Sequence, residues 1–217
     1  MINKDTEIYC SFAKKAGNVG CKVFNTAFKY YDMNKIYKSF SIDNIEDAVK
    51  SVRTLNIKGF AVTMPFKIEV LDYVDYMSNG VKWVGATNTI INEEGILTAY
   101  NTDYNAAKEV LIDCIGKHLY ILGDGGYAKA VQSAARLLNI NHTIVRRDSW
   151  SLIDTIRDSY VYNCTPVEDI KVDESNTFID CITTTKTGKY LSWLQASHQF
   201  KLYTNKELPI RRLDEVS

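Results

Sequence analysis

The sequence has no excess of charge of either sign, since its 217 residues include 26 lysines and arginines and 26 aspartates and glutamates. This balance gives no argument for nucleic acid or an anionic membrane as a partner. No run approaches the roughly 18 apolar residues of a membrane-spanning helix. The N-terminal residues MINKDTEIYC also lack the apolar stretch of a signal peptide. We therefore expect a cytoplasmic protein with no membrane or nucleic-acid partner.

The sequence also lacks closely spaced cysteines. Its five cysteines are odd in number, widely separated, and include no CxxC pair. This pattern argues against a disulfide framework and against a metal site, and it favours reduced thiols. We expect the cysteines to pack as small buried hydrophobic residues.

The overall composition is that of an ordinary globular protein. Hydrophobic residues make up 46% of the chain and charged residues 24%. The length allows one large domain or two small ones, each with a buried core. No internal repeat or low-complexity tract interrupts the chain.

Strand-like and helix-like patterns alternate in the first half of the chain. Asp43 is the expected N-cap of the second helix, and Asn92–Gly95 is the expected turn of a later hairpin. The β-α-β-α-β order predicts a mostly parallel sheet that ends in this hairpin. Strands are expected at 6–12, 35–40 and 59–64, and helices at about 20–31, 42–55 and 104–114.

A second βα series begins at residue 118 and predicts a separate, smaller domain of about four strands. The predicted fold class is therefore α/β with two domains. A mixed-sheet domain would cover residues 1–114, and a reduced Rossmann-like domain would cover 115–187. The last helix, at 188–204, is expected to return to the first domain.

A glycine-rich loop follows the first strand of this second series. Gly123, Gly125 and Gly126 stand between an apolar strand and a small-residue helix, as in loops that bind the diphosphate of a dinucleotide. The alternative is a glycine turn that only packs. Asp124 lies inside this loop, where its carboxylate would repel a diphosphate unless the side chain points away.

The next strand ends in two arginines rather than in an acidic residue. An NAD site usually places Asp or Glu at this position to bind the ribose 2′-hydroxyl. Arg146 and Arg147 suit a 2′-phosphate instead, so the sequence favours NADP over NAD. The alternative is a solvated basic turn.

Polar residues also stand near the ends of several predicted elements. They are Lys67 after the third strand, Asn88 before the hairpin, Asp103 after it and Gln195 on the last helix. Element ends are where α/β proteins gather ligands.

Six motifs together resemble the shikimate dehydrogenases. VTMPFK, GATNTI, YNTD, LGDGGYAKA, NCTP and LQASHQF occur in the order, and at about the spacing, of that family. They cover the chain from about residue 36 to 204, and the N-terminal part looks closest to the shikimate dehydrogenase-like subgroup. The resemblance implies an NADP-dependent oxidoreductase that acts on a shikimate-like cyclic hydroxy acid. The sequence leaves the oligomeric state open between a monomer and a homodimer.

The resemblance also implies roles for individual residues. Lys67 and Asp103 would flank the reacting hydroxyl, with Thr63, Asn88 and Gln195 around the substrate. One residue would take or give the hydroxyl proton as hydride moves, and positioned proton transfer contributes roughly 10²–10⁴-fold.

The same resemblance assigns the cofactor contacts. Thr165 of the NCTP motif would join the glycine loop and the basic pair there. The implied cofactor-binding set is Gly123, Gly125, Gly126, Arg146, Arg147 and Thr165.

The chain departs from the family at the substrate anchor. Asn18 and Gly20 stand where two serines would hold the shikimate carboxylate, and Cys21 and Phe24 replace a proline and a histidine, while Asn25 is retained. Each lost hydroxyl removes a charge-assisted bond of about 1.5–3 kcal/mol. We expect Asn18 and the backbone at Gly20 to contact the substrate, which would then differ from shikimate.

The C-terminal half is also shorter than the family pattern, with only TTTK between FIDCI and TGKYLSWLQ. This shortening keeps a second hypothesis open, a non-catalytic ligand- or nucleotide-binding protein derived from the same fold. A third, an interaction scaffold, rests on the 14 tyrosines, which are more simply core and rim residues.

Overall fold

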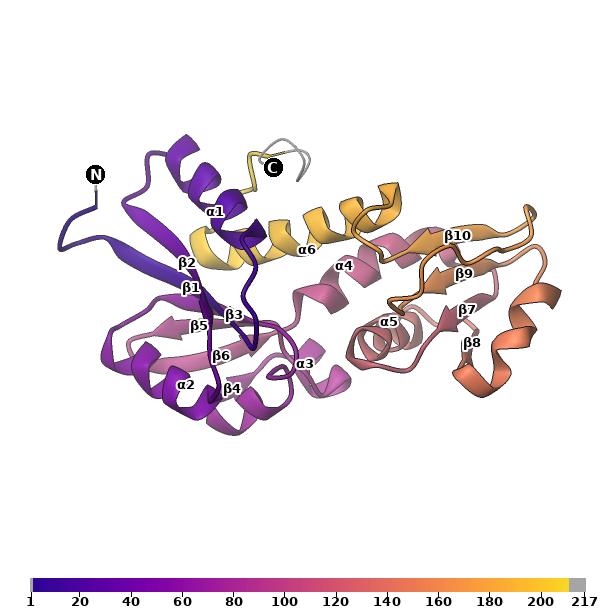
Figure 1. Ribbon diagram of the computed structural model, residues 1–217, viewed down its shortest axis with the longest axis horizontal. Helices are drawn as coiled ribbons and strands as arrows, with labels where there is room; N and C mark the ends of the chain where they lie inside the picture. The colour runs from indigo at the N-terminus through magenta and orange to yellow at the C-terminus, as the bar shows by residue number, and fades with distance from the viewer. Residues whose placement is uncertain (1, 211–217) are drawn as a thin grey trace. The chain divides into compact units, whose positions relative to one another are not determined.

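The computed structural model describes residues 2–210 (Figure 1). Its contacts divide the chain into two compact units. Among the described residues, the first unit comprises 2–102 and 196–210, and the second comprises Asp103–Gln195. The sequence-based boundary at 114–115 lies twelve residues after the first of these divisions, beyond helix α4 (Thr102–Val110).

The first unit is built on a mixed six-stranded sheet of order β2-β1-β3-β5-β6-β4. Strands β1, β2 and β3 are parallel to one another, β5 is antiparallel to β3, and β5 and β6 form the predicted antiparallel hairpin. The strands are β1 (Glu7–Ala13), β2 (Lys35–Ser41), β3 (Gly59–Val62), β4 (Tyr76–Met77), β5 (Thr89–Glu93) and β6 (Ile96–Tyr100). The mixed sheet predicted from the sequence is therefore confirmed.

Helices cover both faces of this sheet because alternate strand residues point to opposite sides. Helix α2 (Ile45–Thr54) buries Val49 and Val52 against Phe12 and Phe60 on one face. On the other face, Phe24 and Phe28 of α1 (Val19–Tyr30) pack around Phe200 and Tyr203 (Figure 1). The short elements η1 (Glu69–Tyr73) and α3 (Asn79–Val84) were not predicted.

The predicted N-cap of α2 is wrong by one residue. Asn44, not Asp43, caps the helix, since its side chain accepts a hydrogen bond from the backbone N–H of Asp47 at 3.0 Å. Asp43 instead forms an exposed ion pair with Lys14 at 2.5 Å. Both residue types cap well, so the local sequence could not separate them.

The last helix, α6 (Lys186–Thr204), ends in the first unit, as predicted. Its C-terminal half is fixed there by buried hydrogen bonds. The hydroxyl of Tyr9 donates to the carbonyl of Tyr203 at 3.0 Å, and Gln199 Nε2 donates to Thr89 Oγ1 at 3.1 Å. Neither α6 nor any other helix within residues 2–210 is long and apolar enough to span a membrane.

The second unit holds a four-stranded parallel sheet of order β10-β9-β7-β8, which confirms the predicted reduced Rossmann-like architecture. The strands are β7 (Leu119–Leu122), β8 (His142–Val145), β9 (Tyr160–Asn163) and β10 (Thr177–Asp180). The helical elements are α4 (Thr102–Val110), η2 (Leu111–Cys114), α5 (Gly126–Leu137) and η3 (Arg147–Thr155).

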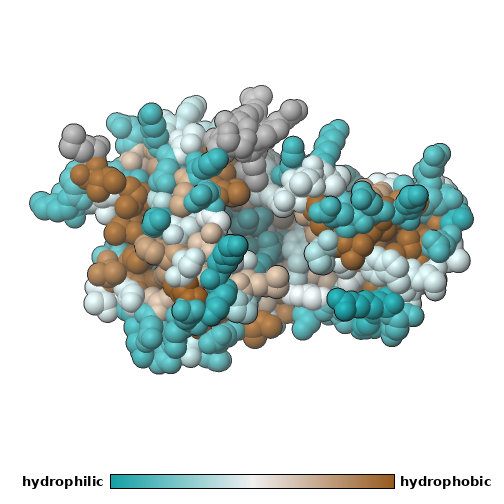
Figure 2. All heavy atoms as spheres, viewed as in Figure 1, coloured by the Kyte–Doolittle hydropathy of each residue, from teal (hydrophilic) through white to brown (hydrophobic). Residues whose placement is uncertain are grey.

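No helix joins β9 to β10, so one face of this sheet is covered by η3 and by irregular chain at 164–176. Leu122 and Val161 are buried on that face, while Ile170, Val172 and Phe178 pack over them and stay partly exposed. The space-filling view shows hydrophobic side chains gathered over β9 and β10 (Figure 2). The chain at 164–176 therefore shields this face of the sheet from solvent less completely than a crossover helix would.

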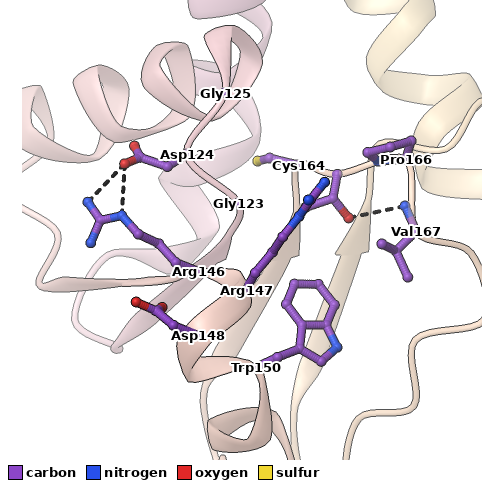
Figure 3. Close-up of a pocket in the computed structure, with 11 residues that line it drawn as sticks. Gly123, Asp124, Gly125, Arg146, Arg147, Asp148, Trp150, Cys164, Pro166 and Val167 are labelled. Carbon is purple, nitrogen blue, oxygen red and sulfur yellow. Dashed lines mark hydrogen bonds and ion pairs between the residues drawn. The ribbon is translucent and has the colours of Figure 1, made fainter.

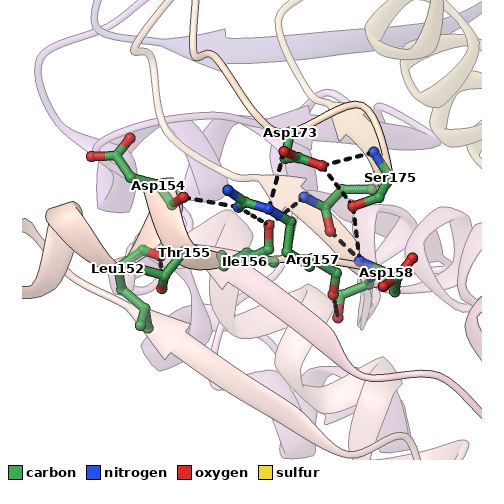
Figure 4. Close-up of polar contacts among 10 residues, drawn as sticks. Leu152, Asp154, Thr155, Ile156, Arg157, Asp158, Asp173 and Ser175 are labelled. Carbon is green, nitrogen blue, oxygen red and sulfur yellow. Dashed lines mark hydrogen bonds and ion pairs between the residues drawn. The ribbon is translucent and has the colours of Figure 1, made fainter.

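Arg157 ties together the two loops that lead into β9 and β10 (Figure 4). Its Nε lies 3.0 Å from Asp173 Oδ2, and its Nη1 donates to the carbonyls of Asp154 and Ile156 at 2.8 Å. The N–H of Asp158 donates to Ser175 Oγ at 3.1 Å. These contacts lie at the amino ends of the strands and leave the carboxyl ends available for a site.

The connection from β10 to α6 is only five residues long, 181–185, and it packs tightly on the helix. A Cβ atom at Gly188 would collide with the backbone carbonyl of Ile182. Thr187 strengthens this junction, because its Oγ1 accepts from the N–H of Asp180 and donates to the carbonyl of the same residue, each at 3.0 Å. The short connection between β10 and α6 therefore requires a residue without a side chain at position 188, where its backbone packs against the helix.

We predict that Gly188→Ala destabilises the protein by about 1–3 kcal/mol, because the added methyl overlaps backbone that cannot move freely. Helix propensity alone predicts the opposite sign, a gain of about 1 kcal/mol. Urea denaturation followed by circular dichroism measures the difference. Gly17→Ala is the matched control, since nothing lies within 4 Å of a Cβ there. A Gly188→Ala protein as stable as wild type would contradict this packing.

Candidate functional site

A cavity of about 890 Å³ lies within the second unit, at the carboxyl edge of its parallel sheet (Figure 3). The chain segments that follow β7, β8 and β9 form its wall. Open α/β sheets bind ligands at this edge. The lining residues are Gly123, Asp124, Gly125, Arg146, Arg147, Asp148, Trp150, Cys164, Thr165, Pro166 and Val167. Five of the six predicted cofactor residues are therefore lining residues of one cavity, and Gly126 follows directly at the start of α5.

The glycine loop has two kinds of glycine. Gly123 has a φ of +99°, and a Cβ there would lie 2.7 Å from Thr165 Cγ2, so the protein itself requires glycine at this position. At Gly125 and Gly126 a Cβ would meet nothing within 4 Å. Helix α5 begins here without a side-chain cap, and its first N–H groups carry partial positive charge. This open helix start suits an anionic group.

Asn163 holds the turn that faces the glycine loop. Its side chain is fully buried at the end of β9. Its Oδ1 accepts hydrogen bonds from the N–H and the Oγ1 of Thr165 at 2.9 and 2.7 Å. Its Nδ2 donates to the carbonyl of Val167 at 3.1 Å and to Asp180 Oδ1 at 2.9 Å. Sequence analysis missed this residue, although it is the first letter of the NCTP motif.

The carboxylate of Asp124 is bound by the protein. Its Oδ2 lies 2.8 Å from Arg146 Nη2 and accepts from Arg146 Nε at 2.9 Å, while its Oδ1 accepts from Gln132 Nε2 at 3.0 Å. The hydrogen bonds from Gln132 and Arg146 lower the pKa of Asp124 below its ordinary value. The side chain therefore points to these partners, which resolves the conflict that the sequence raised for a diphosphate loop.

Arg147 differs from its neighbour. It is exposed, and within residues 2–210 it forms no ion pair. In Figure 3 its side chain runs across the cavity toward the turn at Cys164 and Val167, whereas Arg146 turns to Asp124. Of the two predicted phosphate-binding arginines, only one has its charge offset by a carboxylate.

Two tyrosines, the fully buried Tyr162 and the half-buried Tyr127, contact one another through their hydroxyls. The hydroxyls of Tyr127, in the first turn of α5, and Tyr162, on β9, are 2.9 Å apart. Burial raises the pKa of both, and the charge of Asp103 raises that of Tyr127 further. Asp103 thus lies within electrostatic range of the residue that follows the glycine loop.

Lys67 and Thr63 lie in the first unit, just after β3. Thr63 is exposed and Lys67 is half-buried, and the peptide bond between Met64 and Pro65 is cis. The carbonyl of Lys67 accepts a hydrogen bond from the N–H of Thr87 at 2.9 Å. The backbone around the predicted catalytic lysine is therefore attached to the segment that precedes β5.

Asn88, next to Thr87, holds the start of helix α4. It is buried, its Oδ1 accepts from the N–H of Thr102 at 2.9 Å, and its Nδ2 donates to Thr102 Oγ1 at 2.9 Å. Asp103 follows Thr102 directly. The Thr87–Asn88 pair is thus bonded both to Lys67 and to the residue before Asp103. Because Lys67 belongs to the first unit, and Asp103 and Gln195 to the second, their meeting around a substrate stays a prediction.

The predicted anchor residues lie at the start of α1. Asn18 is the N-cap residue, but its side chain makes no capping bond. A Cβ at Gly20 would lie 2.9 Å from Cε1 of the Tyr37 ring, so a serine cannot be accommodated there without moving that ring. Nearby hydroxyls come instead from the strands, where Ser11 Oγ donates to Ser39 Oγ at 3.0 Å.

Comparison with known proteins agrees with this geometry. Residues 19–90 match the shikimate dehydrogenase substrate binding domain. The chain is similar to a shikimate dehydrogenase-like protein of Haemophilus influenzae, 39% identical over 137 residues, which are 62% of this chain and 51% of the relative. It is also similar to the shikimate dehydrogenase (NADP(+)) of Caldanaerobacter subterraneus, 31% identical over 178 residues, which are 77% of this chain and 64% of the relative.

A solved structure of a shikimate 5-dehydrogenase-like protein matches the whole chain. Its TM-score is 0.87, with 27% sequence identity, and the match covers 100% of this chain and 98% of the other. The chain spans about half to two thirds of the length of the curated relatives that it matches.

We predict that Asn163→Ala lowers the free energy of unfolding by about 2–4 kcal/mol. The substitution removes four hydrogen bonds and leaves buried partners unsatisfied. Thermal and urea denaturation measure the loss. Asn141→Ala is the control, because Asn141 is exposed in the same unit and is expected to change stability by less than about 0.5 kcal/mol. Equal stability of the two variants would contradict the role assigned to Asn163.

Proposed function

We propose that this chain, which belongs to the shikimate dehydrogenase family, is an NADP-dependent oxidoreductase that interconverts a shikimate-like cyclic hydroxy acid and its keto form. One observation carries the proposal. The second unit has a cavity at the carboxyl edge of its sheet, walled by the glycine loop, two arginines and the NCTP turn. The curated relative from Caldanaerobacter is itself named as an NADP(+) enzyme.

The residues of the cavity fit a phosphorylated dinucleotide. The uncapped start of α5 suits the diphosphate, and no side chain at Gly125 or Gly126 obstructs its approach. Arg147 supplies a cation at the end of β8, where the ribose 2′-position is read in such folds. The carboxylate of Asp124 does not oppose binding of the diphosphate, since Arg146 and Gln132 hold it.

Lys67 and Asp103 are the proposed reacting pair. When bound, the nicotinamide accepts or supplies the hydride. The residues of this chain handle the proton: as the hydroxyl carbon loses hydride, its O–H becomes acidic and one of the pair takes the proton. Lys67 is half-buried and Asp103 is the second residue of α4, where the helix dipole favours the ionised carboxylate.

The substrate is proposed to differ from shikimate at its carboxylate. The Tyr37 ring occupies the space that a side chain at position 20 would need. The Tyr37 hydroxyl lies 3.3 Å from that Cβ position, the hydroxyls of Ser11 and Ser39 are hydrogen-bonded at 3.0 Å on the adjacent strands, and Asn18 stands at the start of α1. Another carboxylated or uncharged cyclic polyol fits this changed anchor.

One observation favours a second function, a non-catalytic ligand- or nucleotide-binding protein. Only residues 181–185 connect β10 to α6, and their tight packing on Gly188 leaves no loop there to cover a nicotinamide ring. NADPH binding without turnover of any cyclic hydroxy acid would support this second function. Turnover would exclude it.

We predict that Lys67→Ala lowers the rate of NADP⁺ reduction by about 10²–10⁴-fold, the usual contribution of positioned proton transfer. The variant should bind NADPH as wild type does, because Lys67 lies outside the unit that holds the cavity. The assay screens shikimate, quinate and related acids for NADPH formation, and NADPH fluorescence reports binding.

Lys82→Ala, which replaces an exposed lysine of α3 in the same unit, is the control and should keep wild-type rates. Unchanged activity of Lys67→Ala would eliminate the proposed role of this lysine. Absence of NADPH binding by wild type at millimolar concentrations would remove the oxidoreductase proposal itself.

A further inference from the structure

Two carboxylate residues, Asp124 and Asp148, line the proposed cofactor cavity, although a carboxylate repels a phosphate. Two arginines follow β8, and one of them, Arg146, is ion-paired to Asp124 of the glycine loop. The pair joins residues 22 positions apart, so it brings together two of the three segments that wall the cavity. The charges of Arg146 and Asp124 offset one another next to the place where a 2′-phosphate would bind.

In this solvent-exposed ion pair, the Asp124 carboxylate is bound on both of its oxygens. Both Nε and Nη2 of Arg146 approach the same oxygen of Asp124, at 2.9 and 2.8 Å. The other oxygen accepts from Gln132, which is 5% exposed and lies on the first two turns of α5. A carboxylate held on both oxygens cannot turn away without breaking a hydrogen bond to a buried amide. Arg146 therefore gives up an attractive partner if it binds a phosphate instead.

Arg147 is positioned to bind a 2′-phosphate in place of Arg146. Its side chain extends across the cavity, and within the described residues no carboxylate pairs with it (Figure 3). An exposed guanidinium can bind a phosphate with two parallel hydrogen bonds. The contribution of a 2′-phosphate to binding thus depends on Arg147, whereas Arg146 contributes little.

We infer that Asp124 sets the cofactor selectivity of this protein, by holding Arg146 away from the 2′-phosphate so that NADP is preferred over NAD through Arg147 alone. The inference rests on the proposed function, because it assumes that the cavity takes a dinucleotide. Asp124 is a specificity-determining residue here, and the wild-type preference for the 2′-phosphate is less than about tenfold, which corresponds to about 1.4 kcal/mol.

The test uses two adenosine probes that differ only in the 2′-phosphate, adenosine 2′,5′-bisphosphate and 5′-AMP. Calorimetric titration of the full chain with each gives a ratio of dissociation constants. Asp124→Asn keeps the shape of the side chain but removes its charge. It is expected to raise the preference for the bisphosphate by about tenfold, while Arg147→Gln lowers the ratio to about one.

A double-mutant cycle identifies the cause. Arg146→Gln alone is expected to change the ratio by less than about twofold, and Asp124→Asn is expected to give no gain when Arg146 is already glutamine. Asp154→Asn is the matched control, because it removes the same charge from an exposed position of η3 outside the cavity. Circular dichroism verifies that each variant is folded.

Two results would overturn the inference. An unchanged ratio in Asp124→Asn would show that the carboxylate does not restrain Arg146. A gain that persists in the Arg146→Gln background would assign the effect to general charge rather than to the pair. If wild type binds neither probe, the cavity takes no dinucleotide, and the proposed function fails together with the inference. Binding of both probes with no effect of Asp124→Asn leaves the proposed function intact.

Discussion

The close approach of Thr165 to Gly123 determines the shape of the cavity in the second unit. The Thr165 methyl lies only 2.7 Å from where a Cβ of residue 123 would be, and the positive φ of Gly123 turns the chain away from β7 toward α5. Asn163 imposes this approach, because its buried amide holds the N–H and the hydroxyl of Thr165 together. The same amide contacts Asp180 on β10, so the turn above the glycine loop is anchored to the strand beside it. One buried side chain therefore connects β9, β10 and the turn that follows β9, at the edge where a ligand would bind.

The charges of the cavity follow from that backbone arrangement. The carboxyl ends of β7 and β8 are neighbours in the sheet, so residues that follow them can pair although they are distant in sequence. Asp124 and Arg146 form such a pair, whereas Arg147, one position further, does not. A count of charges in these loops would assign Arg146 and Arg147 the same capacity to attract a phosphate. The structure distinguishes them, because a guanidinium already bound to a carboxylate attracts a phosphate much less than an unpaired one does.

In the first unit, too, some polar groups hold the backbone next to residues that are predicted to act on a substrate. Asn88 was expected to bind a substrate hydroxyl, but its oxygen already holds the start of α4, and its role in a substrate site stays a prediction. The Thr87 N–H holds the backbone of Lys67. Buried amides near the ends of β5 and β9 thus act in the same way in the two units, by fixing the backbone from which a predicted functional side chain projects. At the start of α1, the ring of Tyr37 closes the space next to Gly20, so the substrate anchor is changed by packing as well as by the loss of hydroxyls.

Whereas the short elements η1, β4 and α3 could not be predicted from the sequence, the order of the main strands and helices, the mixed and parallel sheets, the hairpin and the position of the glycine loop could. These features depend on local patterns, namely apolar periodicity, turn residues and glycines that need unusual backbone angles. Only the tertiary structure decided which side chains pair at the site. The partner of Asp124 is 22 residues away, the contact between Asn163 and Asp180 spans 17 residues, and the N-cap at Asn44 rather than Asp43 depends on the direction in which the chain enters α2. The Asp124–Arg146 and Asn163–Asp180 contacts arise because strands distant in sequence align in one sheet, and no local pattern of residues encodes their geometry.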